Sequence, residues 1–284
     1  MQKVLIVGIK GMAGHVIRKY FAGLPGYVVY GIARNIEQDD KTFSIDVSDT
    51  NTLYSILNAH SFDVIVNCIG ILNKDAEDNP DKAVWFNSYF PHLLENWTKN
   101  TTTKVVHIST DCVFSGKKGA YNDTDFKDGI GFYAQSKALG EIINQKDLTI
   151  RTSIIGPELN PNGIGLFHWF MRQPDGAVIK GFTNAFWSGI TTIELAKVIH
   201  ETLRQKITGL FQVAASPKIS KYDLLQIFNE VFRHNKVSII ADGEYKVDKS
   251  LISTRLDFKY DIPDYEEMIL KMRDWVNDIN IYSY

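Results

Sequence analysis

A tyrosine and a lysine four residues apart could form a device for moving a proton. Tyr133 and Lys137 lie in the stretch GFYAQSKALGE, whose alanine, leucine and glutamate residues favour a helix. Residues four apart share one face of a helix. A free phenol has a pKa near ~10, and a nearby ammonium lowers it. The pair therefore predicts a general acid or base that works near neutral pH, unless it is a chance pair on a helix surface.

Hydroxyl and carboxyl side chains end the strand that precedes this helix. The stretch KVVHISTDCVF predicts a buried strand that ends at Ser109 and Thr110 and is followed by Asp111. In doubly wound sheets, ligand sites lie beyond the carboxyl ends of the strands. Hydroxyls at that place can bind a substrate carbonyl or alcohol. The alternative is an ordinary turn, since Ser, Thr and Asp favour turns.

Three glycines follow the first predicted strand. Gly8, Gly11 and Gly14 in VLIVGIKGMAGHVI form a G-x-x-G-x-x-G pattern that leads from that strand into a helix. The N-terminus of a helix offers unpaired N–H groups and the positive end of the helix dipole, which suit a pyrophosphate. Glycines allow a tight turn and close approach of the backbone. The pattern predicts a dinucleotide-binding turn; the alternative is an ordinary glycine-containing turn.

The end of the second predicted strand indicates which dinucleotide would bind. An NAD site usually has Asp or Glu there, which accepts hydrogen bonds from the ribose. Here Ala33 and Arg34 occupy the position, although Glu37 lies close by. An arginine can pair with a 2′-phosphate, so we expect NADP(H), with NAD(H) as the alternative. Asp46, followed by Val47, could bind the adenine amino group or cap the next helix.

Composition narrows the class of protein. The chain has 284 residues, of which 44% are hydrophobic and 23% are charged, and its net charge is −2. These values suit a globular domain and argue against nucleic acid or an anionic membrane as a partner. The chain starts with an apolar run, shows no signal peptide and has no run long enough to cross a bilayer. Cys68 and Cys112 lie in apolar stretches and predict buried free thiols in a reducing compartment, with a disulfide as the alternative. The seven histidines show no metal-ligand spacing. We expect a cytoplasmic protein.

Strand and helix patterns alternate through the first half. Apolar runs predict strands at 3–8, 27–33, 63–70, 104–110 and 148–155, and helices are predicted at 14–21, 49–60, 81–98 and 132–145, the third interrupted at Pro91. This alternation predicts an α/β fold with a doubly wound parallel sheet. We expect a dinucleotide-binding domain at 1–155 and a smaller α/β substrate domain at 156–284, from which segments around 183–215 return to the first.

Four motifs together resemble one enzyme family. GIKGMAG, STDCVFSG, YAQSKALGE and RTSIIG occur in the order found in extended short-chain dehydrogenases/reductases, and most closely resemble the dTDP-4-dehydrorhamnose reductase family. The resemblance implies that Tyr133 donates a proton to the substrate carbonyl and that Thr110 binds the same oxygen. It implies that Lys137 holds the nicotinamide ribose and lowers the pKa of Tyr133, while Asp111 orients the sugar or assists the acid.

The residue patterns and the resemblance together predict a cofactor site and a substrate site; Arg34, Asp46, Val47, Trp187 and Arg255 come from the residue patterns alone. We expect the cofactor to contact Gly8, Gly11, Met12, Gly14, Arg34, Asp46, Val47, Cys68, Ile69, Gly70, Ser109, Tyr133 and Lys137. We expect the substrate to contact Thr110, Asp111, Cys112, Ile154, Trp187 and Arg255, with Arg255 on the diphosphate. His15 is interpreted as an ordinary helix residue.

The chain departs from the family pattern around the sugar. Cys112 stands where the family usually has Tyr, Ala134 where it has Gly, and Ile154 where it has an aromatic residue. NCIGIL replaces a run of alanines. These changes spare the proton-transfer residues, and at least two of them fall in the predicted sugar pocket. They leave the identity of the sugar open.

The expected function is reduction of a 4-keto-6-deoxy nucleotide sugar by NAD(P)H, for cell-surface polysaccharide synthesis. The resemblance also suggests a homodimer. One alternative is a nucleotide-sugar epimerase with tightly bound NAD, against which Arg34 argues. Another is a non-catalytic, NADP-binding regulatory subunit like that of methionine adenosyltransferase, against which Thr110, Tyr133 and Lys137 argue.

Overall fold

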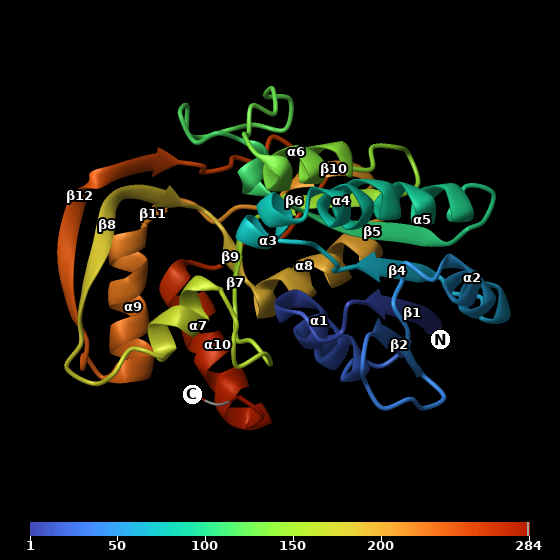
Figure 1. Ribbon diagram of the computed structural model, residues 1–284, viewed down its shortest axis with the longest axis horizontal. Coiled ribbons are helices and arrows are strands. Elements are labelled where there is room, and N and C mark those ends of the chain that lie inside the picture. The colour runs from blue at the N-terminus through green and yellow to red at the C-terminus, as the bar shows by residue number, and fades with distance from the viewer. Residues whose placement is uncertain (283) are drawn as a thin grey trace.

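A seven-stranded parallel sheet forms the larger part of the molecule (Figure 1), in a computed structural model that describes residues 1–282 and 284. Its strands lie in the order β10-β6-β5-β4-β1-β2-β3. The chain runs outward from β1 to β3 and then returns to β4 on the other side of β1. This reversal is where doubly wound sheets bind ligands. The strands are β1 (Gln2–Val7), β2 (Tyr27–Ala33), β3 (Thr42–Ser44), β4 (Val64–Asn67), β5 (Lys104–Thr110), β6 (Leu148–Thr152) and β10 (Gly209–Gln212).

Helices cover both faces of this sheet, because successive side chains of a strand point to opposite faces. Val4 and Ile6 of β1 pack with α1 (Met12–Ala22) and α8 (Thr192–Arg204), whereas Leu5 and Val7 pack with α2 (Thr50–Ala59) and α5 (Phe90–Thr98). All four of these β1 residues are fully buried. The predicted fold class, a doubly wound α/β sheet, is confirmed.

The helix predicted at 81–98 consists of three segments. These are α4 (Pro80–Ala83), a π-helical segment η1 (Val84–Tyr89) and α5, with α3 (Asn73–Asp78) just before them. Pro91 lies in the first turn of α5. Because proline has no N–H to donate, it fits at the start of a helix. The wider π-helical turn of η1 connects α4 to α5, so the helical segments follow one another without a loop.

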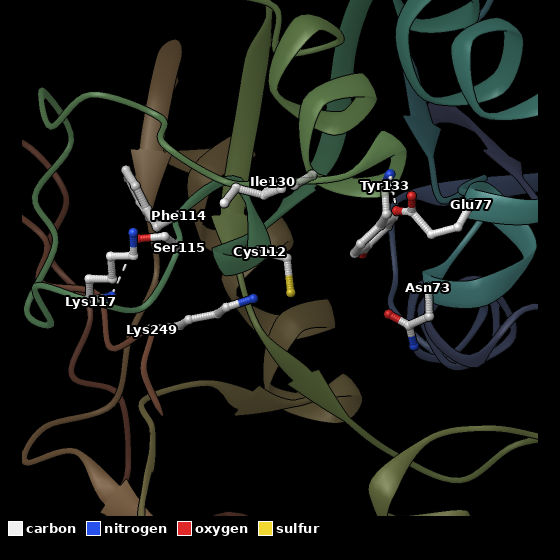
Figure 2. A pocket seen from close by; sticks show the side chains of 10 residues that line it. Asn73, Glu77, Cys112, Phe114, Ser115, Lys117, Ile130, Tyr133 and Lys249 are labelled. Carbon is white, nitrogen blue, oxygen red and sulfur yellow. Dashed lines mark hydrogen bonds between the residues drawn. The ribbon is translucent and has the colours of Figure 1, made fainter. Parts of the chain in front are cut away.

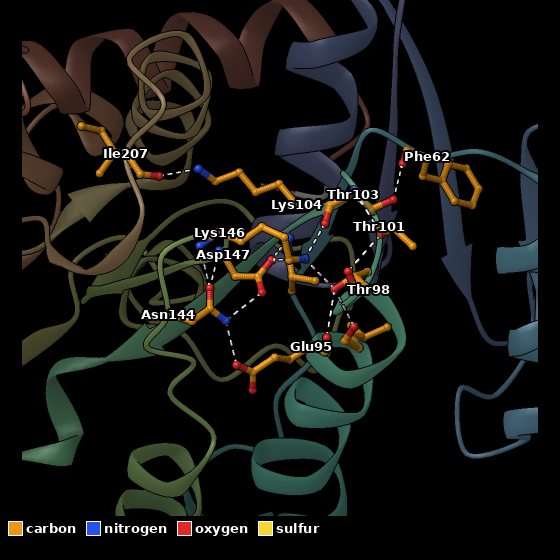
Figure 3. A network of polar contacts seen from close by, with 12 residues as sticks. Phe62, Glu95, Thr98, Thr101, Thr103, Lys104, Asn144, Lys146, Asp147 and Ile207 are labelled. Atoms are coloured by element: carbon orange, nitrogen blue, oxygen red, sulfur yellow. Dashed lines mark hydrogen bonds and ion pairs between the residues drawn. The ribbon is translucent and has the colours of Figure 1, made fainter.

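A polar network lies where β5 and β6 begin (Figure 3). This is the end of the sheet away from Ser109 and Thr110. Asp147 accepts the backbone N–H of Val105 at 2.8 Å and the amide of Asn144 at 2.9 Å. Asn144 also donates to Glu95 of α5 at 2.7 Å. Lys146 binds the Thr103 carbonyl at 2.6 Å. The network fixes the chain that enters β6 against α5.

A second, smaller sheet packs with the later helices. It contains β11 (Ile219–Ser220), β8 (Val178–Trp187) and β12 (Ser238–Asp248), with α7 (Leu166–Met171), α9 (Lys221–Arg233) and α10 (Tyr265–Ile279) beside it (Figure 1). A short parallel pair, β7 (Ile154–Ile155) and β9 (Ile190–Thr191), lies between the two sheets in Figure 1. Across the described residues, no helix has the length and apolarity that a membrane span needs.

Residues 183–215 are shared between the two sheets. β8 ends in the smaller sheet, whereas α8 contacts α1 and β10 pairs with β6. The larger sheet therefore takes an edge strand from beyond residue 156. The division of the chain into domains at 155 and 156 stays a prediction.

Candidate active site

The helix α6 (Phe132–Leu139) carries Tyr133 and Lys137. It begins after Gly131, whose φ of +93° favours glycine. The Glu77 carboxylate of α3 accepts the first N–H groups of the helix, those of Phe132 and Tyr133, each at 3.1 Å. A carboxylate at a helix N-terminus also stabilises the helix dipole. Glu77 thus fixes the helix start, and sequence analysis missed it because it lies on a distant helix.

The prediction that this helix runs to residue 145 is wrong. The helix ends at Leu139, because Gly140 packs directly on η1. A Cβ atom on Gly140 would lie 1.8 Å from the carbonyl oxygen of Asn87. Asn87 also donates to Ser136 Oγ at 3.0 Å and to the Ile71 carbonyl at 2.9 Å. Asn87, another residue that sequence analysis missed, therefore holds α6 against the segment that follows β4.

Thr110 and Asp111 lie where β5 meets a short 3-10 turn, η2 (Asp111–Val113). The Thr110 hydroxyl accepts the N–H of Cys112 and donates to the Asp111 carboxylate, both at 3.1 Å. Burial raises the pKa of Asp111, although Lys249 and the Thr110 hydroxyl oppose the rise. The turn fixes the directions of both side chains at the carboxyl edge of the sheet.

The phenol of Tyr133 lies beside these groups. Burial raises its pKa above the ordinary value, and the neighbouring Cys112 and Asp111 raise it further, whereas a hydrogen bond with Thr110 lowers it. These interactions show that the structure brings Thr110, Asp111, Cys112 and Tyr133 together. At neutral pH the phenol keeps its proton, as a proton donor must.

A pocket of about 330 Å³ opens at Tyr133. Figure 2 shows the phenol, the Cys112 thiol and the Lys249 ammonium directed toward one space, with Asn73 and Glu77 at one side. Lys249 follows β12, and no motif in the sequence pointed to it. A small carbonyl compound placed there would meet a proton donor, hydroxyl and amide groups, and the two lysines Lys117 and Lys249.

The Lys137 amine is directed toward β5. Its Nζ donates to the Ile108 carbonyl at 2.6 Å and lies 3.3 Å from His107 Nε2. Burial lowers the pKa of Lys137 to about 8. In this geometry the amine is directed toward β5, and burial of the phenol raises the pKa of Tyr133; that the charge of Lys137 lowers this pKa stays a prediction.

The glycine-rich turn forms a close-packed cradle at the start of α1. Gly8 has φ +96°, and a Cβ on it would lie 3.1 Å from Ile69 Cγ1. A Cβ on Gly14 would lie 2.2 Å from the Gly8 carbonyl oxygen. Gly11 is the N-cap and supplies no side chain, and no acidic residue lies in the first turn. The positive helix end is thus open to an anion.

The remaining predicted cofactor residues surround this turn. Met12 begins α1, and Cys68, Ile69 and Gly70 follow β4 directly, with the Cys68 N–H bound to the Val7 carbonyl at 3.0 Å.

The end of β2 carries an exposed ion pair. Arg34 Nη1 lies 3.3 Å from Asp46 Oδ2, and 68% of the Arg34 side chain is exposed. Burial raises the pKa of Asp46, but hydrogen bonds from Ser48 and Arg34 outweigh it and hold that pKa below its ordinary value. The structure therefore brings together the two predicted polar contacts of the adenosine end. Val47 beside them is a buried core residue.

Of four further predicted site residues, Ser109 and Arg255 have other polar partners, and Trp187 and Ile154 pack with apolar residues. Ser109 donates to Glu141 Oε1 at 2.8 Å, and Trp187 is buried in the apolar core. Ile154 is half-buried in β7. Arg255 binds Asp257 and the carbonyls of Thr208 and Leu210. The structure does not direct the Arg255 guanidinium to the pocket, whose cations are Lys117 and Lys249.

His15 makes more contacts than an ordinary helix residue. Its Nδ1 lies 2.8 Å from the Gly11 carbonyl and its Nε2 lies 2.9 Å from the Tyr282 hydroxyl. It fixes the first turn of α1 against the end of the chain.

A buried ion pair joins α6 to the sheet. Arg151 of β6 donates two hydrogen bonds to Glu141, from Nε at 2.8 Å and from Nη2 at 2.7 Å. Its Nη1 donates to Gln212 of β10 at 2.8 Å. The Glu141 carboxylate also accepts from Ser109 and, at 3.0 Å, from Lys127. This cluster holds the end of β5, which carries Thr110, at a fixed distance from α6.

Comparison with known proteins identifies the family. The family model described as "RmlD substrate binding domain" matches residues 1–248. The chain belongs to this family. It is 32% identical to a dTDP-4-dehydrorhamnose reductase of Burkholderia thailandensis, over 74% of this chain and 70% of that one. It is 25% identical to a probable low-salt glycan biosynthesis reductase of Haloferax volcanii, over 89% of this chain and 84% of the relative.

Solved structures share the fold. A dTDP-4-dehydrorhamnose reductase of Bacillus anthracis, determined in complex with NADP, aligns with a TM-score of 0.79 at 19% identity, over 96% of this chain and 98% of the other. We predicted an extended short-chain dehydrogenase/reductase similar to the dTDP-4-dehydrorhamnose reductases. The match to the RmlD family confirms this prediction.

Proposed function

We propose that this protein reduces the 4-keto group of a 4-keto-6-deoxy nucleotide sugar with NADPH. One observation supports this most strongly. The proton donor Tyr133 and the hydrogen-bonding groups of Thr110 and Asp111 gather at the carboxyl edge of the same sheet whose first strand leads into the glycine cradle. The curated relatives named above are a dTDP-4-dehydrorhamnose reductase and a probable glycan biosynthesis reductase.

The residues present fit a dinucleotide. The open N-terminus of α1 and the absence of side chains at Gly8, Gly11 and Gly14 suit a pyrophosphate. Arg34, which is largely exposed, suits a 2′-phosphate and favours NADPH over NADH. A reduced nicotinamide dinucleotide supplies, when bound, the hydride for a ketone carbon. Lys137 would hold its ribose, and Cys68 to Gly70 its adenosine side.

The chain's own residues supply the proton and the orientation. Tyr133 gives its phenolic proton to the carbonyl oxygen as that oxygen becomes an alcohol, and the phenolate then regains a proton from solvent. The Thr110 hydroxyl donates its one proton to the Asp111 carboxylate in this structure. When substrate binds, that proton turns to the carbonyl oxygen and strengthens its polarisation, while Asp111 stays beside the hydroxyl. Lys249 and Cys112 contact the sugar nucleotide in the pocket.

The test is a substrate panel. The purified protein is mixed with NADPH and a set of 4-keto nucleotide sugars, and the loss of reduced-nicotinamide absorbance is followed. We expect one NADPH oxidised for each sugar reduced. Sugar interconversion without net oxidation would identify an epimerase instead. Tight capture of a partner protein with neither reaction would identify a regulatory subunit.

We further propose that the protein acts as a cytoplasmic homodimer in the synthesis of a surface glycan. The two free cysteines suit a reducing compartment. Light scattering of the purified protein at micromolar concentration tests the dimer, and a monomeric mass would overturn it.

A further inference from the structure

Two tyrosines follow α10, and each contacts a buried histidine. Tyr282 Oη lies 2.9 Å from His15 Nε2. Tyr284 Oη lies 2.9 Å from His168 Nδ1. His15 is 8% exposed and His168 is 1% exposed. The two tyrosine rings stack, with 6.1 Å between their centroids. Polar groups this deeply buried need matched donors and acceptors, so the direction of each hydrogen bond can be worked out.

The first line of hydrogen bonds ends at the Gly11 carbonyl in the glycine-rich turn. A carbonyl only accepts, so His15 Nδ1 donates to Gly11 at 2.8 Å. Burial lowers the pKa of His15, although the bond to Gly11 opposes this, so the ring is neutral and its Nε2 accepts. Tyr282 therefore donates its hydroxyl proton to His15. The same hydroxyl accepts from Trp275 Nε1 at 3.1 Å, which completes the line.

The second line has the same order of groups and ends in the loop that follows β7. The Pro161 carbonyl accepts from His168 Nε2 at 3.2 Å. In the neutral ring, His168 Nδ1 is then the acceptor. The Tyr284 hydroxyl accepts the backbone N–H of Glu158 at 2.9 Å and gives its own proton to His168. Each tyrosine thus fixes one histidine, and each histidine fixes one backbone carbonyl.

The loop that receives the second line, loop 156–165, packs against the glycine-rich turn that receives the first. Glu158 Oε1 accepts the Gly165 N–H at 2.7 Å and holds the two ends of the loop together. A Cβ atom on Gly165 would lie 3.5 Å from Met12 Sδ, so the loop contacts the first residue of α1. A dinucleotide whose pyrophosphate lies at the N-terminus of α1 would therefore have the turn on one side and this loop on the other.

The first line also sets the direction of an N–H group that the pyrophosphate would meet. The peptide unit between Gly11 and Met12 is planar and trans, so its C=O and N–H point in opposite directions. His15 holds that C=O with its ring and with its backbone N–H, the latter at 3.2 Å. The Met12 N–H has no acceptor within the first turn of the helix. It therefore points out of the helix end, toward the place of the anion.

We propose that Tyr282 and Tyr284 are positioning residues that hold the glycine-rich turn and loop 156–165 in the arrangement that binds the dinucleotide. The identity of the ligand rests on the proposed function. Each tyrosine acts through its histidine, and the stacked rings join the two lines. Without the hydroxyls, the turn and the loop populate other orientations. The apparent affinity then falls in proportion to the population that still binds.

The test is titration of the whole protein with NADPH, followed by nicotinamide fluorescence. Tyr282→Phe and Tyr284→Phe each remove one hydroxyl and keep the ring. We expect each variant to bind NADPH about three- to tenfold more weakly, the range that one lost hydrogen bond represents. Tyr265→Phe is the matched control, because Tyr265 on α10 donates to the Trp187 carbonyl at 3.3 Å, outside both lines. It should bind NADPH as the wild type does.

A double-mutant cycle separates positioning from general loss of stability. His15→Phe breaks the same line as Tyr282→Phe, so the double variant should bind NADPH no more weakly than His15→Phe alone. Urea unfolding of all variants shows whether an affinity loss merely follows a stability loss. Losses that multiply in the double variant, or tyrosine variants that bind NADPH as tightly as Tyr265→Phe does, overturn the proposal.

NMR of ¹⁵N-labelled histidine side chains tests the two lines in the wild type without any ligand, and it decides should His15→Phe not fold. We expect His15 to carry its proton on Nδ1 and His168 to carry it on Nε2. The opposite form at either ring overturns the proposal. A wild type that shows both expected forms yet binds neither NADPH nor NADH overturns the proposed function, and with it the ligand named here. NADPH binding that no variant alters overturns the positioning role alone.

Discussion

Removing Arg151 should destabilise the protein far more than removing an exposed arginine. The Arg151 side chain is 1% exposed and the Glu141 side chain is fully buried. Arg151→Met would leave that carboxylate with only Lys127 and Ser109, and would leave the Gln212 amide oxygen without its donor. Breaking a buried pair in this way costs about 3–5 kcal/mol. Much of the net stability of a domain, roughly 5–15 kcal/mol, would be lost.

The matched control is Arg204→Met. Arg204 pairs with Glu201 on α8 at 2.8 Å, but 63% of its side chain is exposed. Such a surface pair contributes about 0–1 kcal/mol. Arg151→Lys keeps the charge and loses the two-pronged contact, so it should fall between the two.

The assay is urea unfolding, followed by circular dichroism, with all three variants compared at a common slope. The free energy of unfolding that Arg151→Met loses should also depend on pH. Glu141 is buried, which opposes its ionisation, but Arg151 holds its pKa below the ordinary 4.5. The stabilisation is present above that pH and disappears as the pH falls through the lowered value. An Arg151→Met variant that loses no more free energy than Arg204→Met would refute the reasoning.

Three further predictions concern the candidate site. Tyr133→Phe should keep dinucleotide affinity, measured by fluorescence titration, and lose about 10²–10⁴-fold in turnover; retained turnover would exclude Tyr133 as the acid. Arg34→Asp removes the partner of Asp46 and should shift the ratio of kcat/KM values toward NADH, and an unchanged ratio would count against a 2′-phosphate contact. Gly14→Ala places a Cβ 2.2 Å from the Gly8 carbonyl oxygen and should weaken dinucleotide binding at least about tenfold, whereas Gly23→Ala, whose Cβ has 3.5 Å to its nearest neighbour, should not; equal affinities would contradict the cradle.

Local signals in the sequence predicted the sheet and the start of α6. The apolar runs gave β2 and β5 with the bounds that the structure shows, because buried parallel strands are continuous apolar segments. β8 and β12 were not predicted. Gly181 and Asn184 weaken the strand pattern of β8, and Asp242-Gly243 resembles a turn, although the structure places a bulge there.

The parts of the candidate site that could be predicted are those whose residues lie close together in the sequence. Thr110 and Asp111 share one short turn, and four-residue spacing puts Tyr133 and Lys137 on one helix. The contacts of Lys137 were not predictable, because His107 lies thirty positions earlier on a separate strand. Arg255 was predicted from its charge alone, and its nearby partner Asp257 was not weighed.

The late arrival of β10 constrains how the chain folds during its own synthesis. β6 ends at Thr152, yet its outer neighbour begins only at Gly209, and α8, which contacts α1, lies in the same interval. At 5–20 residues per second a ribosome needs roughly 3–11 s to make residues 153–208. During that time the nascent sheet has an open edge and an uncovered apolar face, the two features that chaperones recognise and that drive aggregation.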